Sequence, residues 1–181
     1  SRASSSSASQ TIAPPATPVT TTFVVTIPAT ATGNDSIILT AQSSDPSANS
    51  STPVSITLRV ADVFAPQVNL AVSPPFTQVV VGGSVTVTVH ATDEVGLASI
   101  GFTASGAVST AGNQPVNPPA KSGSASFILA TPITATVGET ITVSGVAIDS
   151  SSNAGGSAPL ILTLVEPGAT IVGMVIDVQH Q

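Results

Sequence analysis

The feature that most constrains the fold of this chain is an alternation of apolar and hydroxyl side chains with a period of two residues. In residues 84–91, three valines alternate with two threonines and His90. Successive side chains of a β-strand point to opposite faces, so this pattern predicts a strand with one buried face. Similar runs, each bounded by turn residues, predict further strands at 22–27, 36–41, 54–60, 68–72, 79–81, 98–103, 126–130, 140–148 and 160–165. The predicted fold class is therefore all-β.

Composition supports a folded β protein rather than a disordered chain. Hydrophobic residues make up 41% of the 181 residues, which is enough for the core of one or two domains. Most of them are valine, isoleucine, leucine and alanine, and the β-branched ones favour strands. Glycine at 14 positions and proline at 15 positions supply the turns that a protein with many strands needs.

An internal repeat defines the size of the folding unit. Residues 22–49 align without a gap with residues 126–153. The matched pairs are 104 residues apart: Phe23 and Phe127, Pro28 and Pro132, Asp45 and Asp149, and Asn49 and Asn153. After a two-residue insertion the match continues, with Pro53 and Pro159 separated by 106 residues. A unit of about 100 residues is the usual size of an immunoglobulin-like sandwich.

The repeat also predicts the domain organisation. We expect a Ser/Pro-rich arm or linker at 1–20, the C-terminal half of a repeat at 21–62, a complete sandwich at 63–167, and the first strand of a following module or a donor strand at 168–181. Three strands cannot close a two-sheet core, so the missing strands must come from upstream sequence, another chain or the arm. Because the sequence begins with Ser1 and no signal peptide, we expect a processed or excised chain.

Junction and turn motifs in this chain resemble those of one protein family. Residues 60–68 contain an acidic residue, a short spacer and Ala-Pro before a strand; residues 91–96 read Ala-Thr-Asp-Glu-Val-Gly, and residues 147–155 read Ala-Ile-Asp-Ser-Ser-Ser-Asn-Ala-Gly. These motifs resemble those of the bacterial immunoglobulin-like (Big-type) tandem repeat domains of large surface and secreted proteins, although Ser152 stands where glycine is common. The resemblance covers residues 21–167. It implies immunoglobulin-like β-sandwich repeats, one complete and one partial, acting as a stalk, spacer or adhesin shaft.

Charge and cysteine content exclude several classes of partner and site. Three basic against nine acidic residues give a formal charge of −6, so the chain cannot neutralise a run of nucleic-acid phosphates. The absence of cysteine excludes disulfides, thiolate metal sites and a cysteine nucleophile. No apolar run approaches the roughly 18 residues of a membrane helix, so membrane insertion is not expected. We expect a secreted or cell-surface protein from a prokaryote.

No constellation of side chains in the sequence indicates catalysis. His90 lies on the polar face of its strand, close to Asp93 and Glu94, and is interpreted as a solvated histidine rather than a catalytic base. His180 is the penultimate residue. The glycine-rich phosphate-binding motifs are missing, so we expect neither an enzyme nor a cofactor site.

Two kinds of binding or modification site remain open. Asp62 at the junction, with Asp93 and Glu94 in a turn, can supply oxygen ligands for calcium, although an Asp in such a turn more often caps its own backbone. Asn34 and Asn49 each begin an N-glycosylation sequon, a pattern that also arises by chance in a chain so rich in serine.

Three hypotheses of function follow from these observations. The first is a non-enzymatic extracellular structural repeat whose partners are neighbouring repeats. The second is a pilus-like filament subunit, in which residues 171–178 or the arm before residue 21 complete the partial unit of another copy by donor-strand complementation. The third is a ligand-binding adhesin module, although the scarcity of aromatic residues weakens it; its surface ligand is unknown.

Overall fold

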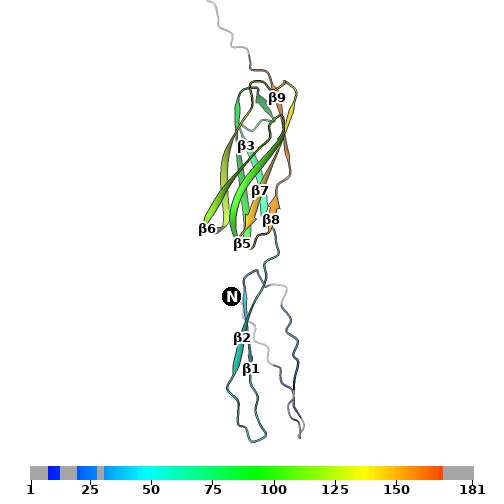
Figure 1. Cartoon of the computed structure of the whole chain (residues 1–181), viewed down its shortest axis with the longest axis vertical. Helices are drawn as coiled ribbons and strands as arrows, with labels where there is room; N and C mark the ends of the chain where they lie inside the picture. The colour runs from blue at the N-terminus through cyan, green and yellow to red at the C-terminus, as the bar shows by residue number, and fades with distance from the viewer. Residues whose placement is uncertain (1–7, 13–19, 28–30, 169–181) are drawn as a thin grey trace, which may run out of the picture. The chain divides into compact units, whose positions relative to one another are not determined.

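The computed structural model describes residues 8–12, 20–27 and 31–168. The strand predicted beyond Gly168 and most of the predicted arm lie outside these residues. The chain divides into two compact units, Ser1–Val63 and Phe64–Gln181. The described residues form nine strands and no helix, which confirms the all-β class (Figure 1). None of the described residues therefore belongs to a helix long and apolar enough to cross a membrane.

The described residues of the first unit form one antiparallel pair of strands, β1 (Ser36–Ala41) and β2 (Val54–Arg59). The strand predicted at 22–27 is absent, because residues 20–27 pair with no other strand among the described residues. The matching residues of the second unit are in a strand only because Ser126 and its neighbours pair with residues that have no counterpart in residues 20–63. Strand propensity without a hydrogen-bonding partner was therefore insufficient to form a strand at residues 22–27.

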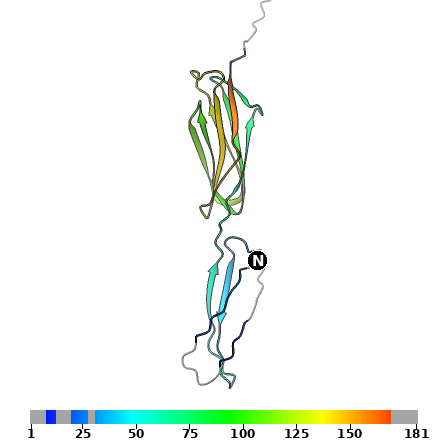
Figure 2. The same cartoon turned by 90° about the vertical axis from the view of Figure 1, so that its right-hand side faces the viewer.

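In the second unit, residues 64–168 form seven strands around one core (Figures 1 and 2). They are β3 (Gln67–Ser73), β4 (Gln78–Val80), β5 (Ser84–Gly106), β6 (Thr110–Ala130), β7 (Thr140–Asp149), β8 (Ala154–Gly156) and β9 (Leu160–Val165). The path of neighbouring strands is β3-β5-β7-β9-β4, with β6 beside β5 and β8 beside β7. All these pairings are antiparallel except that of β4 with β9.

The long strand β5 connects two layers of the second unit. Its first part pairs with β3 and with the end of β6, whereas residues 97–106 pair with β7 and the start of β6. The sequence predicted two strands separated by a turn at Asp93 and Glu94. The strand instead continues through these residues with a register shift between Thr92 and Leu97. The bulge redirects the strand without ending it, because both parts retain β6 as a neighbour.

The core of the second unit is built from the apolar positions of the alternating strands. Val87 and Val89 are fully buried, as the period-two pattern predicted, and Ile141 and Leu162 are fully buried in the other layer. The rings of Phe102 and Phe127 add a tilted contact with centroids 4.9 Å apart. The two layers with a shared apolar interior are consistent with a β-sandwich.

Candidate functional site

The pole of the second unit where β3 begins holds two aspartates. Asp93 lies at the bulge of β5, and its Oδ1 accepts hydrogen bonds from the backbone N–H groups of Val95 and Gly96 at 2.8 and 2.7 Å. The carboxylate thus stabilises the bend of its own strand, as aspartates in turns commonly do. Gly96 has a φ of 148°, a backbone conformation that side chains with a Cβ rarely adopt.

The second aspartate, Asp149, is 1% exposed and organises the turn after β7. Its Oδ1 accepts hydrogen bonds from the backbone N–H groups of Ser151 and Asn153, both at 2.8 Å. Its Oδ2 accepts a third from the side-chain amide of Asn153 at 2.8 Å. Three donors compensate for the removal of this carboxylate from water.

The two turns are tied to each other. The backbone N–H and the hydroxyl of Ser150 both donate to the carbonyl oxygen of Gly96, at 2.8 and 3.1 Å. As a result, a carboxylate oxygen of Asp93 lies within 4.8 Å of one of Asp149. Two negative groups at this distance repel each other, and a divalent cation with oxygen ligands would relieve that repulsion. Sequence reasoning missed Asp149 at this position, because only the pairing of β5 with β7 brings it to Asp93.

The sequence analysis also assigned Glu94 and Asp62 to a calcium site. Glu94 is exposed beside Asp93. Asp62 is half-buried and lies in the last residues of the first unit, outside the unit that contains Asp93 and Glu94. Calcium binding by Asp62, Asp93 and Glu94 therefore stays a prediction.

A turn in the first unit repeats the arrangement around Asp149. The Oδ1 of Asp45 accepts hydrogen bonds from the backbone N–H groups of Ser47 and Asn49, and its Oδ2 accepts one from the Asn49 side chain. Hydrogen bonds from the Asn49 side chain first, and from the backbone of Asn49 and Ser47, hold the pKa of Asp45 below its ordinary value of 3.8. Asp45 and Asn49 thus match Asp149 and Asn153 both in residue type and in hydrogen-bond pattern.

Both sequon asparagines have a structural role in the first unit. Asn34 has a φ of 69°, the left-handed conformation that Gly138 adopts at the matching position with a φ of 91°. Asparagine tolerates this conformation better than most residues. The side-chain nitrogen of Asn49, to which a glycan would be attached, donates to Asp45 at 2.8 Å. Glycosylation at Asn34 and Asn49 stays a prediction, with this hydrogen bond competing at Asn49.

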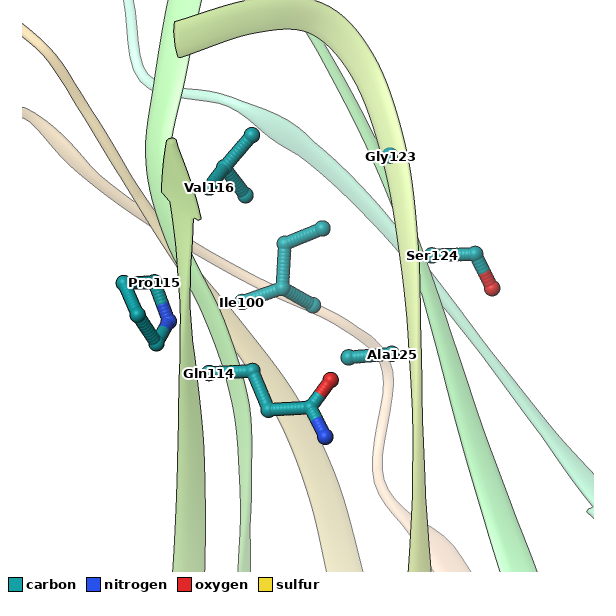
Figure 3. A pocket seen from close by; sticks show the side chains of 7 residues that line it. All are labelled: Ile100, Gln114, Pro115, Val116, Gly123, Ser124 and Ala125. Carbon is teal, nitrogen blue, oxygen red and sulfur yellow. The ribbon is translucent and has the colours of Figure 1, made fainter. Parts of the chain in front are cut away.

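A shallow hollow of about 190 Å³ lies on the second unit, between two parts of β6 (Figure 3). Its lining residues are Ile100, Gln114, Pro115, Val116, Gly123, Ser124 and Ala125. The side chain of Ile100 lies between the two parts of the strand, and none of the seven residues is charged. Such a lining suits a small apolar group and offers no acid, base or nucleophile pair. His90 is exposed on β5, whereas His180 lies outside the described residues.

The sheet of the first unit has an apolar face on which Ile37 and Leu39 are half-buried and the residues of β2 are exposed. Register places Ile37 opposite Leu58 and Leu39 opposite Ile56, so these four side chains share one face. Ile56 is 56% exposed and Leu58 42% exposed. Contiguous exposed apolar surface is common at sites where proteins contact other polypeptides.

No family model matches the sequence of this chain, and no curated protein matches it either. The geometry of the two units is therefore the basis for a functional proposal.

Proposed function

We propose that this chain is a non-enzymatic extracellular structural repeat, built from immunoglobulin-like sandwich units and used as a stalk, shaft or filament building block. The observation that carries the proposal is the repetition of whole hydrogen-bonded turns at a separation of 104 residues. Asp45 with Asn49 and Asp149 with Asn153 make the same three contacts. The same local structure built twice in one chain supports an organisation as an array of units.

A second pair of turns supports the array. The carboxylate of Asp35 accepts a hydrogen bond from the N–H of Thr32 at 3.0 Å, and that of Glu139 accepts one from Thr136 at 3.0 Å. These positions are again 104 residues apart. The turns before β1 and before β7 are therefore alike, as are the turns after these strands.

The path of the chain through the second unit suits a spacer. Gln67, where β3 begins, is opposite Thr92, close to the bulge of β5. Val165, where β9 ends, is paired with Val80, and Thr163 with Thr140 at the start of β7. The ends of β7 thus mark two poles about 30 Å apart, with the chain entering at one and leaving at the other. Function then resides in length and in resistance to tension along the strands.

Pulling the purified chain by its ends in a single-molecule force experiment tests this proposal. We expect the second unit to unfold in one event at a measurable force, with a contour increase on the order of 300 Å. A smooth extension with no force peak, or a reproducible hydrolytic activity of the same preparation, would contradict it.

A filament subunit is the second candidate, and the exposed apolar face of the β1–β2 sheet favours it. A unit that lacks half of its strands gains stability when another polypeptide supplies them. A mass measurement by light scattering over a dilution series tests this: species larger than one chain that survive dilution support it, and a monomer at all concentrations contradicts it. Calcium binding and a location outside the cell are also proposals, and neither of these two experiments tests them.

A further inference from the structure

Among the described residues the β1–β2 sheet has two free edges, and one of them lies along β1. Among the described residues, β1 pairs with β2 on one side and with no strand on the other. The edge is six residues long and contains no charged residue or proline, the devices that usually block strand addition. Ile37 and Leu39 lie on one face of the strand, and Ile38 and Thr40 lie on the other. An edge of this kind accepts an added strand with apolar residues at every second position.

The second unit shows which strand occupies the matching edge. Ile141 and Val143 of β7, 104 residues after Ile37 and Leu39, are fully buried. They belong to the core that both layers share, and residues 97–106 of β5 pair antiparallel with β7 beside them, with Ala104 opposite Val143. In that added strand the buried side chains are those of alternate residues, such as Phe102 and Ala104. The strand that completes the first unit should have the same orientation and the same alternation.

Residues 171–178 have this alternation in their sequence. Val172, Met174, Ile176 and Val178 are all apolar, whereas the residues between them are Gly173, Val175 and Asp177. One side of an extended segment would thus be wholly apolar and the other would tolerate solvent. The apolar side has the spacing of Ile100, Phe102 and Ala104 in β5.

The position of this segment in the chain favours a second copy as its acceptor. It follows Val165, which lies at the pole opposite the junction with the first unit. The five residues between Val165 and residue 171 span at most about 20 Å, which is less than the ~30 Å back to the other pole. We propose that residues 171–178 of one copy add as an antiparallel strand to the β1 edge of another copy. This inference rests on the proposed self-association of the second candidate function.

The absence of cysteine allows a direct test by disulfide trapping. One variant carries Ile38→Cys on the acceptor edge, and others carry single cysteines at residues 173, 175 and 177 or at residues 174 and 176. Directly opposed residues in an antiparallel pair share a face, so Ile38 should face residues 173, 175 or 177. Each acceptor is mixed with one donor variant whose thiol has been activated as a mixed disulfide, so that every hybrid bond is intermolecular.

We expect hybrid dimers with cysteines at residues 173, 175 or 177, and at least tenfold less with cysteines at 174 or 176. The matched control acceptor is Ile128→Cys on β6, because Ile128 is 77% exposed and Ile38 is 68% exposed; it should trap no donor. A chain ending at Gly168 should lose the large species and keep the fold of the second unit.

The outcomes separate this inference from the function on which it rests. Large species without trapping at Ile38, or with equal trapping at Ile128, overturn the donor assignment but leave self-association intact. A monomer at all concentrations overturns both. A bond formed within a single monomer carrying Ile38→Cys and Val175→Cys would show that the chain's own tail occupies the edge, and would overturn the inference.

Discussion

The titration of Asp45 depends on one neighbouring residue. Removing the amide with Asn49→Ala should raise the pKa of Asp45 towards 3.8, because the side-chain hydrogen bond of Asn49 is the largest cause of its lowered value. Carboxyl chemical shifts measured by NMR across pH follow this directly. Asn153→Ala in the second unit is the control and should leave the titration of Asp45 unchanged; an unchanged pKa in Asn49→Ala would contradict the assignment.

The same hydrogen bonds make the first turn sensitive to acid. A carboxyl whose pKa is lower in the folded state stabilises that state above its unfolded pKa, and this contribution is lost as the pH falls through the folded pKa. The window for Asp45 therefore lies below about pH 3.8. The protection of the Ser47 and Asn49 amides from hydrogen exchange, relative to their intrinsic rates at each pH, should fall there because both donate to Asp45, and the fall should be smaller in Asn49→Ala.

Gly155 is held by steric contact rather than by a turn. A Cβ built at this position would overlap the backbone carbonyl of Pro66, at the start of the second unit. Gly155→Ala should therefore destabilise the second unit by about 1–3 kcal/mol, because backbone has to shift. Gly168→Ala is the matched control, since a Cβ there meets nothing within 4 Å. Equal urea midpoints for the two variants would disprove the steric role.

At the scale of elements, the loss of stability on replacing a leucine by alanine shows whether the apolar face of its strand is covered. Leu58 and Leu162 are 104 residues apart, and each lies opposite an isoleucine. Leu162 is fully buried and Leu58 is 42% exposed. In the monomer, Leu162→Ala should cost about 2–5 kcal/mol and Leu58→Ala less than about 1 kcal/mol. Urea denaturation measures both, and equal costs in the monomer would mean that the face in the first unit is already covered.

Strand pairing also corrects the repeat as read from the sequence. The sequence match shifts from 104 to 106 residues at Pro53 and Pro159. Register instead places Leu58 opposite Ile37 as Leu162 is opposite Ile141, so the separation of 104 residues is retained in β2 and β9. A shift of two residues leaves each side chain on the same face, so the pattern of the sequence alone could not distinguish the two registers.

At the scale of the whole molecule, calcium removal tests the predicted metal site. If the carboxylates at the pole of the second unit bind calcium, added calcium should raise the melting temperature of that unit, and a chelator should reverse the effect. Asp93→Asn should abolish the increase, whereas Asp35→Asn in the first unit should not. Calorimetry with and without calcium measures this; an unchanged melting temperature would dismiss the site and leave Asp93 and Asp149 as turn-stabilising residues.

The sequence by itself determined the alternating core strands of the second unit and the turns at Asp45 and Asp149, because both depend on local geometry; it did not predict β8 or residues 110–125 of β6. Alternation with period two follows from the pleat of a single strand, and an aspartate that accepts from residues two and four positions later needs only a short loop. Tertiary structure decided the rest. Residues 22–27 pair with no strand among the described residues and form none themselves. β5 continues through its bulge because β6 stays beside it, and Asp149 reaches Asp93 only through the pairing of β5 with β7. These outcomes depend on contacts between residues far apart in the chain, which a local pattern does not encode.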